Sequence, residues 1–230
     1  MINELKNCLI FGATGSIGNY LFNKFSNENI NVIGTTTNKD KLNSNTIYVT
    51  NDYLNNLQTI PDINMIIWAH GSNCSDNITT FNCDTFDKMI DANVKFILNT
   101  LNYLLINNKI LKNSKMVIVS SIWQDLTKEN KLSYSITKSS LNCLVKNIAY
   151  DLSSLNSLIN NVLPGVIDNE MTHQNLSETQ INFVKNYTHF NRLINLDDIY
   201  NTIKFLVIEN TGITGQSIKV DLGFTNIKKI

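Results

Sequence analysis

The sequence is poor in residue types that would otherwise point to a function. Arg192 is the only arginine, and 19 basic residues are balanced by 19 acidic ones, so the formal net charge is zero. Without an excess of positive charge, we expect the chain to bind neither nucleic acid nor an anionic membrane. Any bound anion must be held by lysines, hydroxyl groups or backbone amides.

Cysteine is also scarce. Cys8, Cys74, Cys83 and Cys143 form no CxxC pair and no zinc-spaced cluster with the three histidines. We therefore expect reduced thiols, no metal site and a cytoplasmic location. The first six residues carry charges of both signs, unlike a signal peptide. No apolar run approaches the roughly 20 residues that a membrane span needs.

Proline and glycine are infrequent, with two and nine residues, whereas asparagine occurs 38 times. Hydrophobic residues make up 43% of the 230 residues, which excludes a disordered chain. No repeat, linker or low-complexity block divides the sequence. We therefore expect one domain over residues 1–230.

Short apolar runs alternate with longer segments of helical spacing. We expect strands at residues 6–12, 31–34, 46–49, 65–69, 115–121, 158–163 and 217–220. We expect helices at residues 16–25, 85–106, 134–155 and 197–209, the last one capped by Asn195. This order predicts the α/β class: a single-domain, Rossmann-like, doubly wound parallel sheet with helices on both faces. In such sheets a ligand lies beyond the carboxyl ends of the strands.

The first strand is followed by the glycine-rich segment GATGSIG. Its glycines stand between a strand and a helix, where a backbone of small residues approaches a phosphate closely and the helix start offers free N–H groups. The context favours dinucleotide binding over a plain tight turn. The residues of this segment that we expect to bind the cofactor are Gly12, Thr14, Gly15, Ser16, Ile17 and Gly18.

The end of the second strand predicts which dinucleotide binds. NAD enzymes place an acidic residue there on the ribose 2′-hydroxyl, but this chain has Thr35, Thr36, Thr37, Asn38 and Lys39. Hydroxyl, amide and ammonium groups accept a 2′-phosphate that a carboxylate would repel. We expect NADP as the cofactor, with NAD as the alternative.

Tyr134 and Lys138 stand four residues apart in YSITK, on one face of an expected helix. An ammonium beside a phenol stabilises the phenolate, so such a tyrosine trades a proton with a carbonyl or alcohol oxygen. The YxxxK pattern also begins at Tyr20 and Tyr200. Only Tyr134 follows a strand that ends in serines, with Ser121 thirteen positions before it, and this context favours Tyr134.

With these segments in place, the whole chain resembles the short-chain dehydrogenase/reductase family, and is particularly similar to 3-oxoacyl-[acyl-carrier-protein] reductases. The resemblance implies that Tyr134 is the general acid in reduction and that Lys138 binds the nicotinamide ribose and lowers the pKa of Tyr134. It implies that Ser121, with Ser120 as runner-up, hydrogen-bonds the substrate oxygen. It also implies that Asn93, in DANVK, holds a water of a proton relay.

Other segments of the family match less closely. The middle glycine of the phosphate turn is Ser16, and an arginine frequent in NADP-using relatives is Gly15. The family's Asn-Asn-Ala-Gly is Trp68-Ala69-His70-Gly71, and a glycine near the end is Leu222. The adenine-contacting acid corresponds to Asp52 or to residues 49–51. The remaining cofactor contacts implied by the resemblance are Ala69, Gly71, Pro164, Gly165, Ile167 and Asn169.

These residues predict an NAD(P)-dependent oxidoreductase that interconverts a ketone and a secondary alcohol of small-molecule size. The resemblance implies a homodimer or homotetramer. Two alternatives keep the fold: a catalytically silent dinucleotide-binding regulator, and a sugar-nucleotide-modifying enzyme. An intact Ser121, Tyr134 and Lys138 set argues against the first. The short stretch between Asn169 and Thr214 leaves little room for the second. We expect the segment 171–189 to cover the substrate.

Overall fold

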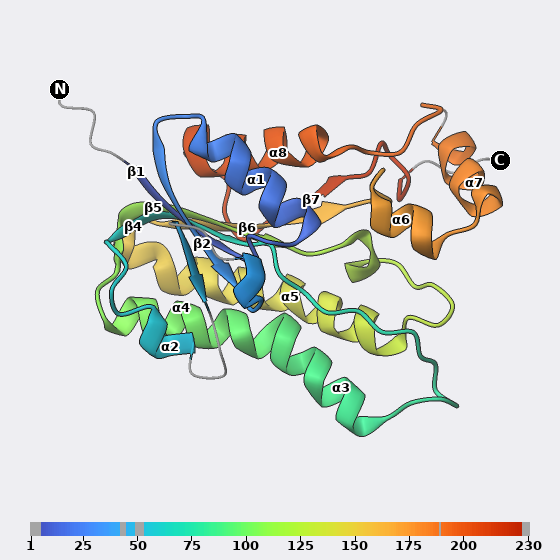
Figure 1. Cartoon of the computed structure of the whole chain (residues 1–230), viewed down its shortest axis with the longest axis horizontal. Coiled ribbons are helices and arrows are strands. Elements are labelled where there is room, and N and C mark those ends of the chain that lie inside the picture. The colour runs from blue at the N-terminus through green and yellow to red at the C-terminus, as the bar shows by residue number, and fades with distance from the viewer. Residues whose placement is uncertain (1–5, 42–44, 49–52, 189, 227–230) are drawn as a thin grey trace.

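A computed structural model describes residues 6–41, 45–48, 53–188 and 190–226. Its seven strands form one sheet, in which all neighbouring strands are parallel, in the order β3-β2-β1-β4-β5-β6-β7 (Figure 1). The strands are β1 (Lys6–Phe11), β2 (Ile30–Thr36), β3 (Thr46–Tyr48), β4 (Ile63–Trp68), β5 (Ile110–Val119), β6 (Leu158–Pro164) and β7 (Ser217–Val220). The predicted doubly wound parallel sheet is therefore confirmed.

Helices cover both faces of this sheet. The helices are α1 (Ser16–Ser26), α2 (Tyr53–Asn56), α3 (Cys83–Ile90), α4 (Phe96–Ile106), α5 (Leu132–Asp151), α6 (Glu170–Asn175), α7 (Glu178–Tyr187) and α8 (Leu196–Lys204). In Figure 1, α1 and α8 lie above the sheet, and α3, α4 and α5 lie below it.

The buried side chains divide into two clusters, one on each face. Strand residues such as Phe11 and Ile66 pack against Leu101 of α4 and Leu141 of α5. The alternate strand residues pack against α1 and α8. Successive residues of a strand point to opposite faces, so a strand covered on both sides is mostly apolar, and the buried Asn160 and Asn161 of β6 are hydrogen-bonded. This explains why the strands are short apolar runs in the sequence.

The sheet changes its winding direction at β1, which lies between β2 and β4. The chain moves outward through β2 and β3, and then returns to β4 on the other side of β1. The crevice that this reversal opens at the carboxyl ends of the strands is where such folds bind ligands. It lies between the glycine-rich turn after β1 and the loop after β4.

The long helix expected at residues 85–106 is interrupted. Asn82 caps its start, accepting a hydrogen bond from the Thr85 amide, and a π-helical turn (Asp91–Lys95) separates α3 from α4. Such turns insert an extra residue into a helix and are frequent at functional sites. This one carries Asn93, which is buried.

Other boundaries also differ from the sequence expectation. Strand β5 begins at Ile110, five residues early, and its pairing with β4 shifts register between Ile63 and Met65. Helices α2, α6 and α7 are short and largely polar, so they give no clear periodicity. A capping box of Ser177 and Gln180 marks the start of α7. A serine followed three residues later by glutamine is a known sequence signature of a helix start, so this helix could have been predicted. The expected end of the third strand, at residue 49, lies outside the described residues.

Seven described residues other than glycine have a positive φ angle. Six are asparagines: Asn29, Asn108, Asn113, Asn130, Asn156 and Asn191; the seventh is Leu222, at φ 54°. Asparagine tolerates the left-handed region better than most residues. The abundant asparagines therefore occupy turn positions that glycine often takes.

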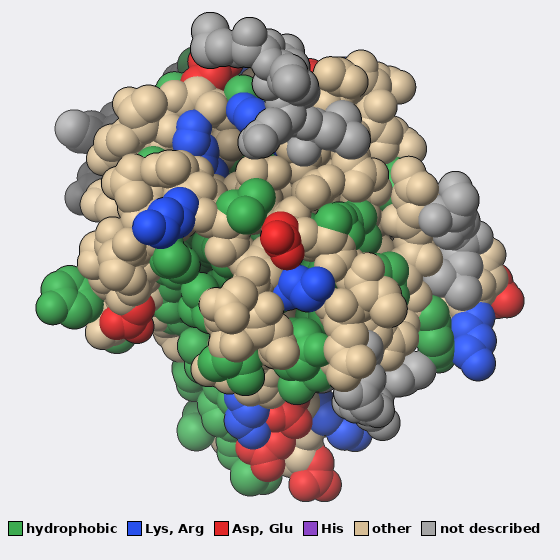
Figure 2. All heavy atoms as spheres, turned by 90° about the vertical axis from the view of Figure 1, so that its left-hand side faces the viewer, with side chains coloured by type: hydrophobic (Ala, Val, Ile, Leu, Met, Phe, Trp, Pro, Cys, Tyr) green, Lys and Arg blue, Asp and Glu red, His purple; other side chains and the backbone are tan. Residues whose placement is uncertain are grey.

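No described helix is both long and apolar enough to cross a bilayer. Figure 2 views the molecule from the left-hand side of Figure 1 and shows acidic and basic side chains interspersed on that face, without an extensive patch of one sign.

Candidate active site

The glycine-rich turn after β1 depends on two of its glycines. Gly12 has φ 79°, and a Cβ atom there would lie 2.8 Å from the backbone of His70. A Cβ on Gly18 would lie 2.1 Å from the carbonyl oxygen of Gly12. Only glycine fits at either position, so the turn brings the start of α1 tightly against the end of β1.

The N-terminus of α1 opens onto this crevice. It has no side-chain cap and no acidic residue in its first turn, so its N–H groups and its positive dipole end suit an anion. Asn169, in the loop after β6, donates a hydrogen bond to the Ser16 hydroxyl at 3.3 Å. Asn169 also caps α6 by accepting from the Thr172 amide. This side chain therefore joins the phosphate turn to the segment that follows β6.

A cavity of about 290 Å³ lies beside the turn, between the ends of β2 and β4. Its walls come from the glycine turn, the threonine segment, the loop after β4 and the start of the α4 region. The lining residues are Gly12, Thr14, Thr35, Thr36, Thr37, His70, Gly71, Ser72, Ala92 and Phe96. Its place at the switch point and its largely apolar lining, with a few hydroxyl groups at the edge, suit the adenosine half of a dinucleotide.

His70 stands in this wall with one ring nitrogen bonded and one unbonded. Its Nε2 lies 3.0 Å from the Ala92 carbonyl oxygen and must therefore donate, which leaves Nδ1 as an acceptor. Nδ1 is buried and has no partner among the described residues. Burial, reinforced by the charge of Lys138, lowers the pKa of His70 to about 3. The imidazole therefore stays neutral, and a hydroxyl or amino group of a ligand would satisfy it.

The threonines at the end of β2 play different parts. Thr35 and Thr36 are buried; the Thr35 hydroxyl accepts from the Gly12 amide at 3.3 Å, and the Thr36 hydroxyl lies 2.9 Å from that of Thr14. Only Thr37 is exposed. Lys39 lies 5.1 Å from the ring centre of Tyr48, in the next strand.

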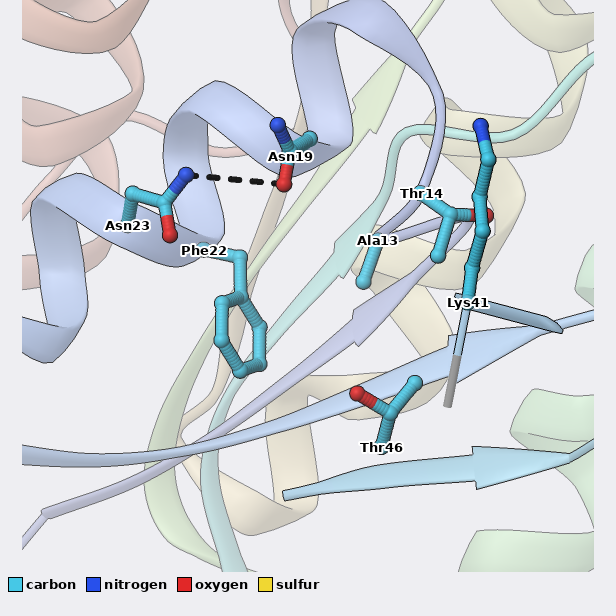
Figure 3. Close-up of a pocket in the computed structure, with 7 residues that line it drawn as sticks. All are labelled: Ala13, Thr14, Asn19, Phe22, Asn23, Lys41 and Thr46. Carbon is cyan, nitrogen blue, oxygen red and sulfur yellow. Dashed lines mark hydrogen bonds between the residues drawn. The ribbon is translucent and has the colours of Figure 1, made fainter. Parts of the chain in front are cut away.

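A second cavity, of about 260 Å³, opens on the α1 side of Thr14 (Figure 3). Lys41 extends along it from the β2–β3 connection, while Asn19 and Asn23 face it from α1. Lys41 could not be recognised from the sequence, because only the fold brings it close to the glycine turn. Asp52 and residues 49–51, the expected adenine contacts, lie outside the described residues.

Ser121, Tyr134 and Lys138 converge beyond the end of β5. The Tyr134 hydroxyl faces the Ser121 side chain, whose influence lowers the pKa of the phenol, and the Lys138 ammonium lies 5.8 Å from the Tyr134 ring centre. Lys138 is buried and donates to the Val119 carbonyl oxygen at 3.1 Å. A Cβ atom on Gly71 would lie 3.5 Å from that ammonium, so the loop after β4 forms the neighbouring wall.

The titration behaviour of this group differs from what the resemblance implied. Burial raises the pKa of Tyr134, and only the Ser121 side chain opposes it. Burial lowers the pKa of Lys138 to about 8. The expected lowering of the Tyr134 pKa by Lys138 is not found, because the ammonium is turned to the Val119 carbonyl. A raised pKa keeps the phenol protonated and thus able to give a proton.

Asn93 reaches this group from the π-helical turn. Its side chain accepts from the Ser72 amide at 2.7 Å, and donates to the Ser72 carbonyl at 2.9 Å and to the Thr137 hydroxyl at 3.0 Å. Both N–H groups of this side chain and one acceptor position of its oxygen are therefore taken by protein groups. Ser120, the runner-up to Ser121, has a buried hydroxyl without a partner among the described residues.

The remaining expected cofactor contacts line the same edge of the sheet. Ala69 follows β4, its amide bonded to the Phe11 carbonyl at 2.9 Å. Pro164 ends β6, and the Gly165 amide donates to the Val220 carbonyl at 2.9 Å. Ile167 pairs with Ile194 in an isolated bridge. The described residues contain no cluster of His, Cys, Asp and Glu suited to a metal ion.

These features together test whether a dinucleotide fits. The open helix start, the glycines that admit no side chain, the unbonded His70 nitrogen and the buried Lys138 ammonium all lie along one crevice. They offer partners for phosphates, for polar groups of the adenosine half and for a ribose beside Tyr134. The residues present therefore fit a nicotinamide dinucleotide.

Comparison with known proteins agrees with this geometry. A family model described as enoyl-(acyl carrier protein) reductase matches residues 57–225. The 3-oxoacyl-[acyl-carrier-protein] reductase of Rickettsia felis is 26% identical, over 95% of this chain and 96% of its own. An L-rhamnose 1-dehydrogenase (NADP(+)) of Thermoplasma acidophilum is 27% identical, over 73% of this chain and 67% of its own.

Among solved structures, a gluconate 5-dehydrogenase from Burkholderia cenocepacia in complex with NADP and tartrate superposes with a TM-score of 0.87. The alignment covers 97% of this chain and 96% of that one at 15% identity, so it establishes the fold alone. The family match extends over most of the chain. The protein therefore belongs to the short-chain dehydrogenase/reductase family of NAD(P)-dependent oxidoreductases.

Proposed function

We propose that this protein reduces a ketone to a secondary alcohol, or catalyses the reverse reaction, with NADP(H) as cofactor and Tyr134 as the proton donor. The observation that carries the proposal is the convergence of Ser121, Tyr134 and Lys138 beside a crevice suited to a dinucleotide. A bound nicotinamide supplies or accepts the hydride.

The side chains have separate tasks in this proposal. In reduction, Tyr134 gives its phenolic proton to the carbonyl oxygen as the C=O double bond becomes a C–O single bond. The Ser121 hydroxyl, which faces Tyr134, would turn its one proton to the same substrate oxygen and stabilise the charge that develops there. Lys138 holds a positive charge at the ribose side of the site. Asn93 holds Ser72 and Thr137 in place, and its backbone is the proposed support for a relay water.

The cofactor would lie along the carboxyl ends of β1, β4 and β6. The residues proposed to hold it are those of the glycine turn, the threonine segment and the two opposing loops: Gly12, Thr14, Gly15, Ser16, Ile17, Gly18, Thr35, Thr36, Thr37, Lys39, Ala69, Gly71, Tyr134, Lys138, Pro164, Gly165, Ile167 and Asn169. The Asn169–Ser16 hydrogen bond supports this arrangement, because it joins the two ends of the crevice.

The preference for NADP is supported by the polar cavity beside Thr14. Lys41, Thr37 and Lys39 offer positive charge and hydroxyl groups near the end of β2, and β2 itself ends without a carboxylate. The nearest acid along the chain is Asp40, which is exposed. The curated relative from Thermoplasma acidophilum carries NADP(+) in its name.

The cofactor preference is tested by measuring NADPH and NADH affinities at moderate salt. We expect NADPH to bind more tightly, and Lys41→Ala to weaken NADPH by about 3–10-fold while NADH is unchanged, since one exposed charge pair contributes about 1 kcal/mol. Thr37→Asp should weaken NADPH further by repulsion. Lys112→Ala, an exposed lysine of β5, is the control. Equal affinities in the parent chain would contradict the NADP proposal.

The reaction itself is tested by a turnover screen of ketones, β-keto acyl thioesters and keto-sugars with both cofactors.

Assembly is a separate question: Leu98, Ile106 and Ile136 expose apolar side chains on α4 and α5, which supports a homodimer or homotetramer through the lower face in Figure 1. Light scattering measures it. The four cysteines are free thiols, in keeping with the proposed cytoplasmic location.

A further inference from the structure

Helix α5 carries Tyr134 in its first turn but has no cap of its own. Lys131, the residue before the helix, makes no side-chain capping bond, and the first turn holds no acidic residue. The first N–H groups of any helix lack partners within the helix and must find them elsewhere. At this helix the question matters, because Tyr134 is the third residue of the turn.

Asp76, in the loop between β4 and α3, supplies the missing partners. Its carbonyl oxygen accepts from the Leu132 amide at 3.2 Å, and its Oδ1 accepts from the Ser133 amide at 3.0 Å. Its Oδ2 accepts a short hydrogen bond from the Ser133 hydroxyl. Asp76 is 6% exposed and Ser133 is fully buried, so these bonds are shielded from water.

The neighbouring groups keep this carboxylate ionised. Burial alone would raise the pKa of Asp76, but the two bonds from Ser133, a bond from the Cys74 side chain and the charge of Lys131 outweigh burial and lower it. A negative charge at a helix N-terminus is also favoured by the helix dipole.

The loop that carries Asp76 is fixed at its other end as well. Asn93 holds both backbone groups of Ser72, and Lys131 donates to the Asn73 side chain at 2.8 Å. Ser72 lines the cavity beside the glycine turn. Residues 72–76 therefore connect the proposed cofactor crevice to the first turn of α5.

We infer that Asp76 is a positioning residue for Tyr134: by capping α5 from another loop, it holds the turn from which the phenol meets Ser121. The inference rests on the proposed role of Tyr134. Asp76 itself touches neither substrate nor cofactor. Neither the sequence pattern nor the family resemblance assigns it a role.

The chemistry of the cap predicts how variants differ. Asp76→Ala removes both side-chain acceptors. Asp76→Asn keeps one acceptor for the Ser133 amide, and its NH₂ group donates to the Ser133 hydroxyl, which accepts as readily as it donates. The asparagine variant therefore keeps the two-point contact and loses only the charge. Asp84→Ala, an exposed acid in the first turn of α3, is the matched control.

The experiment measures kcat, KM and the pH profile of kcat on a ketone that the parent protein reduces, together with NADPH affinity. We expect Asp76→Ala to lower kcat by about 10-fold or more with NADPH affinity changed less than about 3-fold, as for the loss of an arrangement needed in the transition state. The pH at half-maximal kcat should shift, because the Tyr134–Ser121 contact is altered. Asp76→Asn should restore kcat to within about 3-fold of the parent.

Hydrogen exchange of the peptide amides at residues 132–134 gives a readout that needs no turnover. Exchange there should be faster in Asp76→Ala than in the parent and in Asp84→Ala. If Asp76→Ala does not fold, Ser133→Ala removes the hydroxyl bond alone and should still lower kcat and shift its pH profile.

Unchanged kcat and pH profile in a folded Asp76→Ala, or unchanged exchange at these amides, would overturn the inference. A failure of the proposed function is recognised separately, by full activity of Tyr134→Phe in the same assay.

Discussion

Two tyrosine–lysine pairs with identical spacing have opposite surroundings in this molecule. On α8, Tyr200 and Lys204 both donate to the carboxylate of Glu28, which lies between α1 and β2. The Lys204 Nζ atom lies 2.5 Å from Glu28 Oε1. On α5, Tyr134 meets the Ser121 hydroxyl and Lys138 meets a backbone carbonyl. The same four-residue spacing thus gives a structural ion pair in one helix and a candidate proton donor in the other.

The difference lies in the partner. Glu28 raises the pKa of Lys204, so this ammonium stays charged, and its charge is balanced by the Glu28 carboxylate. Burial without a carboxylate lowers the pKa of Lys138 to about 8. A carboxylate beside a Tyr–Lys pair accepts the hydrogen bonds of the tyrosine and the lysine and balances the lysine charge. In a pair without such a carboxylate, the tyrosine hydroxyl and the lysine charge remain available to a ligand.

The largest expected difference is in kcat, between variants that lack the hydroxyl of one tyrosine or of the other. Tyr134→Phe should lower kcat by the ~10²–10⁴ that the loss of a general acid causes, with cofactor binding retained through Lys138. Tyr200→Phe should leave kcat within about 2-fold and lower the free energy of unfolding by about 1 kcal/mol, since it loses one hydrogen bond. Steady-state kinetics and urea unfolding measure the two effects. An essential Tyr200 or Tyr20 would reverse the comparison.

The second prediction uses pH to compare the two lysines. Because its pKa is lowered to about 8, the charge of Lys138 is present at pH 7 and is lost as the pH rises through 8. The affinity of the free enzyme for NADPH should therefore fall by about 3–10-fold between pH 7 and pH 9.5, the equivalent of roughly 1 kcal/mol for one charge interaction. Fluorescence titration measures it.

Lys138→Met should abolish this pH step, whereas Lys204→Met should retain it, because the raised pKa of Lys204 keeps its charge constant over the same range. An unchanged step in Lys138→Met would mean that another group titrates there.

The smallest expected effect concerns the structural pair. Glu28→Ala leaves the Tyr200 hydroxyl and the Lys204 ammonium without their acceptor, and should lower the free energy of unfolding at pH 7 by about 1–2 kcal/mol with kcat unchanged. Burial raises the pKa of Glu28, but the bonds from Lys204 and Tyr200 outweigh it, so the net pKa is lowered. This stabilisation is therefore present above the ordinary pKa and is lost on acidification. Urea unfolding at pH 7 and pH 3 should show the two proteins converging at the lower pH.

Local patterns predicted the sheet and the glycine turn, because each depends on residues close in sequence or on the order of strands; the choice of Tyr134 rests on the same kind of pattern and stays a prediction. The role of Asp76 could not be predicted, since the bonds that define it join a loop to a helix 57 positions away. Lys41 was missed for the same reason. The direction of the Tyr134 pKa was wrong, because it depends on burial and on where the Lys138 ammonium turns.

Leu222 shows how this fold diverges. The family resemblance places a glycine there, yet the leucine keeps a left-handed backbone, at a strain cost on the order of 1 kcal/mol. Asparagines hold six further left-handed positions. Exchanges of this kind change the residue and leave the path of the chain intact. Residue identity to the Burkholderia cenocepacia structure can therefore drop to 15% while the TM-score remains 0.87.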